Sequence, residues 1–137
     1  MIDAAFAPAQ GALDTAPLRT PEPLREPEPL REPAAFDALV REIGQDGASE
    51  VRGVFWNETI ARLKLLRTLA LDQHRARIAR EAHSLKSTAR TFGYLRLATL
   101  ALLLESTVDA LGEAEFCGLL QQLDAAFAEA KALESRD

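Results

Sequence analysis

The sequence predicts an all-α protein, an antiparallel up-down four-helix bundle preceded by a short additional N-terminal helix and an extended Pro-rich N-terminal tail. Three observations predict it. All seven prolines lie at or before Pro33. From Ala34 onward, apolar residues recur at helical spacing, and no segment alternates with the period of two that marks a strand. The breaks between the long segments are very short, which favours antiparallel neighbours.

The proline-rich region, residues 1–33, is expected to be a disordered tail, and residues 34–137 the helical domain. The sequence PEPLRE occurs twice in tandem, at residues 21–26 and 27–32. Proline fixes its own φ and disfavours helix in the residue before it, so the tail should be extended or polyproline-like. Its leucines recur every six residues (Leu18, Leu24, Leu30) and could dock weakly on a surface; the alternative is a plain spacer.

The first two helices are separated by a glycine. Phe36, Leu39, Val40 and Ile43 share one side of a short helix that Gly44 ends. A longer helix should follow over about residues 48–71, with Asp46 as its cap. Its apolar stripe comprises Val51, Phe55, Leu63, Leu66 and Leu69.

Three further helices complete the bundle. Asp72 is the expected cap of a third helix that runs to Phe92, where Gly93 supplies a left-handed stop. A fourth, over about residues 95–111, is apolar nearly all round and must be covered on most sides. A fifth spans about residues 113–133, with an apolar line of Phe116, Leu119, Leu120, Leu123, Phe127 and Ala130.

Composition excludes several classes of protein. A net charge of -5 argues against a general nucleic-acid binder. The N-terminus lacks the basic residues of a secretory signal. The longest apolar stretch, residues 97–104, is far shorter than the roughly 20 residues of a membrane span. A single cysteine, Cys117, suits a reducing compartment and is expected to pack in an apolar helix. We therefore expect a soluble cytoplasmic protein that binds neither nucleic acid nor membrane.

His83, one of two histidines, is predicted to lie on an outer helix face. At about 100° per residue, the third helix gathers its apolar residues into one stripe opposite His83: Ile78, Ala82, Leu85, Ala89 and Phe92. The face of His83 carries small residues that would let a protein approach, and cations that can contact an anion: Ala76, Ala79, Ser87, and Arg80, Lys86, Arg90. His74 lacks such neighbours and is interpreted as structural or incidental.

The region around His83 is locally basic. Nine basic residues stand against two acids between Arg62 and Arg96: Arg62, Lys64, Arg67, Arg75, Arg77, Arg80, Lys86, Arg90 and Arg96. Such a cluster is either a solvated helix face, or a docking surface for an acidic pocket or a phosphoryl group.

An exposed neutral imidazole is a nucleophile near neutral pH if its second nitrogen is held. His83 lies ten residues before Gly93 and Glu105 twelve after it, so both should stand at one height in an antiparallel pair. The alternative is that Glu105 merely ends an apolar run and faces water. Zinc-ligand spacing, G-x-S-x-G and a glycine-rich GK[ST] loop are all missing from the sequence.

The pattern around His83 resembles a known family. His83-Ser84-Leu85-Lys86-Ser87-x-Ala89-x-x-Phe92-Gly93, followed by Leu97, Leu100 and Leu104-Glu105, is similar to histidine-containing phosphotransfer (HPt) domains. Their usual pattern is H-x-L-K-G-x-A-x-x-x-G before a leucine-rich helix that ends in leucine-glutamate. The resemblance covers about residues 34–135, and Ser87 is a mild departure where the family often has glycine.

The resemblance implies a role for each site residue. His83 would accept a phosphoryl group from the aspartate of one receiver domain and pass it to another. Lys86 would steady the phosphoryl oxygens, and Glu105 would orient the imidazole. The docking face would include Ala76, Ala79, Arg80, Ser87 and Arg90.

The resemblance also implies the partners, the receiver domains of a hybrid histidine kinase and of a response regulator. No cofactor is expected on this chain, since Mg²⁺ comes with the receiver. The sequence has no ATP-binding segment, so the protein should be a monomeric phosphocarrier that does not phosphorylate itself.

Other interpretations stay open. A helical adaptor would use the basic face only for binding. The phosphoacceptor helices of sensor kinases carry H-E-x-[RK]-[TN]-P, which Ser84 and Thr88 do not match. A detached phosphotransfer segment of a chemotaxis-type kinase is nearer. Because nothing after Leu133 continues into a linker, a free-standing carrier is expected.

Overall fold

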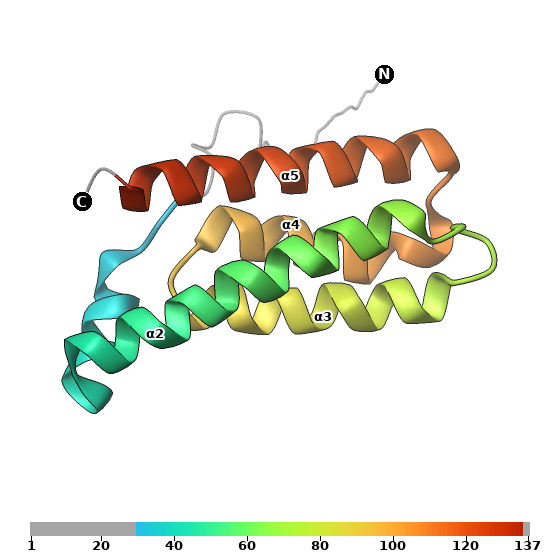
Figure 1. Ribbon diagram of the computed structural model, residues 1–137. Helices are drawn as coiled ribbons and strands as arrows, with labels where there is room; N and C mark the ends of the chain where they lie inside the picture. The colour runs from blue at the N-terminus through green and yellow to red at the C-terminus, as the bar shows by residue number, and fades with distance from the viewer. Residues whose placement is uncertain (1–29, 136–137) are drawn as a thin grey trace, which may run out of the picture.

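The computed structural model describes residues 30–135, which form helices joined by short turns (Figure 1). The helices are α2 (Pro33–Thr68), α3 (Arg75–Thr91), α4 (Leu95–Thr107) and α5 (Glu113–Ser135), with a short 3₁₀ helix, η2 (Val108–Ala110), between the last two. No strand occurs within the described range. The all-α prediction is therefore confirmed. Of the expected extended tail, residues 1–33, the first 29 lie outside the described residues. The last four do not form a disordered tail: residues 30–32 pack on the bundle and Pro33 begins α2.

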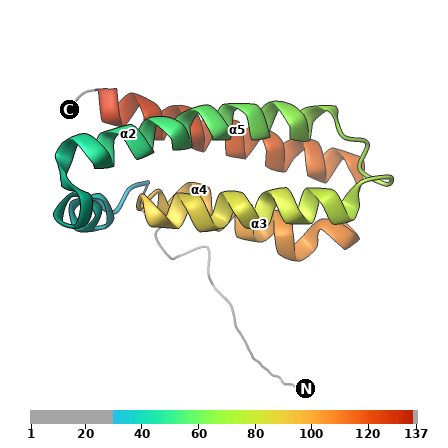
Figure 2. The same cartoon turned by 60° about the horizontal axis from the view of Figure 1, so that its bottom comes forward.

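The four long helices pack in two layers. α2 lies beside α5 and α3 beside α4, and contacts between α2 and α3 and between α4 and α5 join the layers (Figure 2). Successive helices run in opposite directions, as the short connections predict. The α3–α4 turn therefore lies at the same end of the bundle as the C-terminus of α5 (Figure 1).

Gly44 divides α2 in two. Its backbone lies at φ 86 and ψ 163, a region open essentially to glycine, and the helix bends there. The residues expected to form a separate leading helix are the first part of α2, and the expected second helix is the remainder. Asp46 lies inside α2, and the helix ends at Thr68 rather than Leu71.

The expected cap of the third helix is wrong. α3 begins at Arg75 with His74 in the N-cap position, and no side chain caps it. The carboxylate of Asp72 instead accepts a hydrogen bond from Arg75 Nη2, at 2.5 Å. Arg75 also donates to the carbonyl oxygens of Val108 and Leu111, at either end of η2. These hydrogen bonds hold η2 against α3. The fourth helix was expected to run to about Leu111, but α4 ends at Thr107 and η2 follows it.

The core contains the predicted stripe of α3. Ile78, Ala82, Leu85, Ala89 and Phe92 are all buried, and they pack with residues from the other helices. Gly93 ends α3 with φ 81, so the predicted left-handed stop is confirmed. Next to it, five aromatic rings contact one another in one cluster: Phe55, Trp56, Phe92, Tyr94 and Phe127.

Three packing expectations are wrong. Cys117 is exposed, because its neighbour Phe116 takes the core-facing position. Val51, assigned to the apolar stripe of the second helix, is 42% exposed. Ile43, assigned to the apolar side of the leading helix, is 47% exposed. In α4, Leu97, Ala98, Ala101 and Leu104 are buried, while Leu102 and Leu103 are 39% and 45% exposed.

Candidate functional site

His83 lies at the middle of α3 with its side chain 58% exposed. Its neighbours Ala82 and Leu85 are fully buried, so the helix turns its apolar stripe inward and the imidazole outward. The structure thus places His83 where the helical wheel predicts. Among the described residues, the imidazole meets a polar partner only through Nδ1, on the ring edge that points toward α4.

Glu105 of α4 bridges His83 and Lys86. Its Oε2 lies 2.9 Å from His83 Nδ1, and its Oε1 accepts a hydrogen bond of 2.9 Å from Lys86 Nζ. Both carboxylate oxygens are therefore engaged by two residues one turn apart on α3. The equal heights expected of His83 and Glu105 hold, and Glu105, with a side chain 26% exposed, does not simply face water.

The electrostatics of the bridge favour one tautomer of His83. The hydrogen bond from Lys86, with a further one from His83, lowers the pKa of Glu105 below its ordinary value and outweighs the opposing effect of desolvation. An ionised carboxylate only accepts hydrogen bonds, so the proton between the two groups resides on Nδ1. In the neutral imidazole, the other ring nitrogen, Nε2, then keeps its lone pair.

The expected docking face divides into exposed and packed residues. Ala76, Arg80, Ser87 and Arg90 are exposed, on the same side of α3 as His83. Ala79 is partly buried and packs against the core. The small side chain of Ser87, one turn from His83, leaves the approach to the ring uncrowded.

Most of the basic cluster is already paired. Five of its nine residues form ion pairs: Arg62 with Glu81, Arg67 with Asp124, Arg75 with Asp72, Lys86 with Glu105, and Arg96 with Glu129. Lys64, Arg77, Arg80 and Arg90 make no ion pair with any described residue. Three of these four lie on α3, so the positive surface that a partner would meet is narrower than the sequence suggests.

Sequence reasoning missed Leu102. It precedes Glu105 by three residues, which puts it one turn away on the same side of α4, and it is 39% exposed. It adds an apolar element beside the polar site. The only signal for it was its i, i+3 spacing from Glu105, which the uniformly apolar sequence of α4 concealed.

Other kinds of site find no support in the described part of the chain. Residues 30–135 contain no group of three or more His, Cys, Asp or Glu side chains that could hold a metal ion. No helix in that range is long and apolar enough to cross a membrane.

Comparison with known families gives a match over most of the bundle. The family model of the Hpt domain matches residues 50–133, which include His83, Lys86 and Glu105. Comparisons with curated proteins and with solved structures gave no match. Hpt domains take part in histidine phosphotransfer in phosphorelays and interact with receiver domains of two-component systems. Because the match covers more than half of the chain, this protein belongs to the Hpt domain family.

Proposed function

We propose that this chain is a phosphorelay intermediate in which His83 reversibly accepts a phosphoryl group from a receiver-domain aspartate and passes it to another receiver. The observation that carries the proposal is the bridge from His83 Nδ1 through Glu105 to Lys86. It holds the ring by one nitrogen and leaves the other as an exposed nucleophile.

The transfer step follows from this arrangement. The lone pair of His83 Nε2 attacks the phosphorus of the aspartyl phosphate, a P–N bond forms, and the P–O bond to the carboxylate breaks. The aspartate leaves as a carboxylate, and Nδ1 keeps its proton. Positive charge therefore develops on the ring, and the carboxylate of Glu105, 2.9 Å from Nδ1, stabilises it.

Lys86 supplies the compensating charge on the phosphoryl side. In the unphosphorylated protein its ammonium group binds Glu105 Oε1 and is largely buried, with 14% of the side chain exposed. We expect one of its donors to turn to the phosphoryl oxygens as they arrive, because phosphoryl transfer depends chiefly on positioning and charge compensation. No cofactor is needed on this chain, since Mg²⁺ is bound by the receiver.

The exposed face of α3 is the proposed docking surface. Ala76 and Ser87 are small enough for a receiver to come close, and Arg80 and Arg90 carry charge complementary to an acidic phosphorylation pocket. Ala79 lies at its edge. The proposed partners are the receivers of a hybrid histidine kinase and of a response regulator, which a monomer in the cytoplasm would meet in turn.

A direct experiment tests the proposal. Full-length protein is mixed with a receiver domain whose aspartate has been labelled with radioactive phosphoryl. We expect the label to move to this chain, to be labile in acid and stable in base, and to move on to a second receiver.

Matched histidine variants give the control. His83→Gln should take no label, whereas His74→Gln, which removes the other histidine of the chain, should take as much as the wild type. If His83→Gln accepts label as readily as the wild type, His83 is not the phosphoacceptor. A chain that binds receivers but never accepts label is an adaptor. Label acquired only from a kinase's ATP-binding domain would favour the chemotaxis-type segment.

A further inference from the structure

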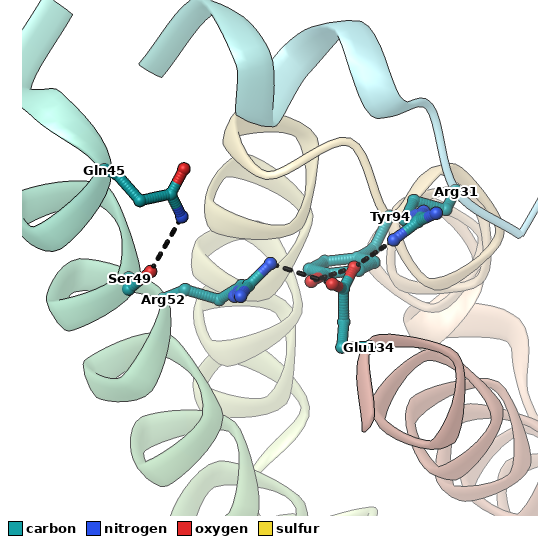
Figure 3. Close-up of polar contacts among 6 residues, drawn as sticks. All are labelled: Arg31, Gln45, Ser49, Arg52, Tyr94 and Glu134. Carbon is teal, nitrogen blue, oxygen red and sulfur yellow. Dashed lines mark hydrogen bonds and ion pairs between the residues drawn. The ribbon is translucent and has the colours of Figure 1, made fainter. Parts of the chain in front are cut away.

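The three residues Leu30–Glu32, which we call the strap, lie against the end of the bundle that carries the α3–α4 turn. Leu30 packs against the hydrophobic core. Arg31 Nη1 donates a 2.8 Å hydrogen bond to Glu134 Oε2 of α5 (Figure 3). The backbone N–H of Glu32 donates to the carbonyl oxygen of Gly93, at 2.6 Å. The strap is thus bound through an apolar side chain, a guanidinium group and the backbone.

The carboxylate of Glu134, which binds Arg31 of the strap, is held in place by two other residues. Glu134, with 10% of its side chain exposed, also accepts hydrogen bonds from Arg52 at 2.8 Å and from the hydroxyl of Tyr94 at 3.0 Å (Figure 3). These two partners fix the carboxylate from α2 and from the start of α4. The guanidinium of Arg52 is held in turn over the ring of Phe36, 4.2 Å from its centroid.

Gly93 completes this docking site. A Cβ atom on residue 93 would overlap the carbonyl oxygen of Glu32 and lie 2.9 Å from the Cβ of Ala35, far inside contact distance. The strap can therefore approach the turn only because residue 93 has no side chain. This close approach is a second reason for glycine, independent of its positive φ.

The strap is the second copy of a tandem repeat. Leu30–Arg31–Glu32 ends the second PEPLRE and precedes Pro33, just as Leu24–Arg25–Glu26 ends the first PEPLRE and precedes Pro27. Every group that binds the docking site is present in the first copy too: the leucine side chain, the guanidinium and the backbone N–H. One period earlier, Pro17–Leu18–Arg19 repeats the third to fifth residues of the motif.

We propose that the docking site formed by Gly93, Tyr94 and Glu134 is a peptide-binding site for a Pro-Leu-Arg segment, and that the first PEPLRE copy is an alternative occupant that replaces the strap by a six-residue shift in register. The tail would then carry spare ligands for a site on its own domain. This inference is independent of phosphoryl transfer at His83.

Chain connectivity sets the balance between the two occupants. The strap runs directly into α2 through Pro33, the first residue of that helix. When the first copy binds, the six residues 27–32 must close a loop. For a loop of n residues, this lowers the equilibrium constant for binding by a factor of about n^(3/2), which is about 15-fold here. The strap is therefore the main occupant in the wild type, and the first copy takes over when the strap is damaged.

A four-protein comparison on the full chain tests this. One set of substitutions damages the strap (Leu30→Asp, Arg31→Ala). A second set damages the earlier copies (Leu24→Asp, Arg25→Ala, Leu18→Asp, Arg19→Ala). Urea unfolding is measured for the wild type, each set and both together. We expect the second set to leave stability unchanged when the strap is intact. When the strap is damaged, the second set should raise the unfolding equilibrium constant at least tenfold, about 1.4 kcal/mol. No effect in either background, or an equal effect in both, overturns the proposal.

A peptide experiment supplies an independent measurement. The synthetic peptide PEPLREP should raise the melting temperature of the protein carrying both sets of substitutions, whereas PEPLAEP should raise it much less, because it lacks the guanidinium for Glu134. Equal effects of the two peptides, or none, overturn the proposal. If the strap set prevents folding, Arg31→Ala and Arg25→Ala replace the two sets, with the same expected non-additivity.

Discussion

At the scale of single residues, the site depends on one carboxylate that serves two partners. Glu105 binds His83 with one oxygen and Lys86 with the other, so a change at any of the three residues alters the remaining pair. Lys86 thus has a role before any phosphoryl group arrives, because its hydrogen bond stabilises the carboxylate form of Glu105 that binds the imidazole. The protonation of Glu105 is the property in which this coupling can be measured.

Lys86→Ala should raise the pKa of Glu105 toward its ordinary value. The hydrogen bond from Lys86 is the largest cause of the lowered pKa, and it favours the charged carboxylate, so its loss favours protonation. The contribution of the charged Glu105 carboxylate to stability should then be smaller than in the wild type, and on acidification it should be lost at a higher pH. Carbon-13 NMR of the Glu105 carboxyl group during a pH titration measures the shift.

The same variant should accept phosphoryl roughly tenfold more slowly with unchanged helicity, since compensation of phosphoryl charge is lost. Lys64→Ala is the matched control: it removes an exposed lysine of α2 that makes no ion pair within the described residues. It should leave both the titration and the rate as they are. An unchanged transfer rate in Lys86→Ala would remove Lys86 from the site.

At the scale of helices, local pattern predicts the interior of each element better than its ends. The stripe of α3 was predictable because five buried residues repeat with the helical period. The start of α3 was not, because the carboxylate of Asp72 is taken by Arg75 rather than by the helix N-terminus. The end of α4 was missed for a similar reason: Arg75 binds the carbonyl groups of Val108 and Leu111, more than 30 positions along the chain.

The site divides in the same way. The height of Glu105 beside His83 was predictable, because both residues are counted from one tight turn at Gly93. The pairing of Lys86 with Glu105 was not, because helical periodicity gives the face on which a side chain lies but not the partner that a long, flexible lysine takes. Likewise, the second requirement for glycine at position 93 arises from the strap, a segment 61 residues earlier in the sequence.

Replacing Gly93 by alanine tests that second requirement. Gly44 provides a matched control, because it also has a positive φ but nothing lies within 4 Å of the position that a Cβ atom would take there. Gly44→Ala should cost only backbone strain, about 1–2 kcal/mol. Gly93→Ala should cost its own backbone strain plus the displaced strap, about 3 kcal/mol or more in all. Urea denaturation of the two variants measures the difference.

A double-variant comparison identifies the strap as the cause. Once Gly93→Ala has displaced the strap, adding Arg31→Ala should change stability little, whereas Arg31→Ala should retain its full effect on Gly44→Ala. Equal costs for the two glycine substitutions, with Arg31→Ala additive in both, would mean that residue 93 needs glycine only for its φ.

At the scale of the whole molecule, the His83 site and the Glu134 cluster that joins the helices lie in different parts of the bundle. The His83 bridge lies ten residues, about 15 Å along α3, from the Gly93 end of the bundle. At that end, Glu134 joins Arg31, Arg52 and Tyr94, which are 103, 82 and 40 positions away in the sequence. Burial and the charge of Glu134 raise the pKa of Tyr94, whose hydroxyl donates a hydrogen bond to that carboxylate. One carboxylate thus ties the strap, α2, α4 and α5 together.

Glu134→Ala should therefore destabilise the fold without impairing the chemistry. It removes the hydrogen bonds that Glu134 accepts from two guanidinium groups and a buried hydroxyl, which we expect to cost about 3 kcal/mol. Glu129→Ala, on the same helix, removes the ion pair between Glu129 and Arg96, whose side chains are 57% and 36% exposed, and should cost less than about 1 kcal/mol. Thermal and urea unfolding of both variants measure these costs.

Phosphoryl transfer, measured well below the melting temperature, should match the wild type in both, because His83, Lys86 and Glu105 keep their contacts. If the Glu134→Ala protein is as stable as the Glu129→Ala protein, the bundle does not rely on this cluster. If a fully folded Glu134→Ala protein transfers phosphoryl slowly, the Glu134 cluster and the His83 site are coupled.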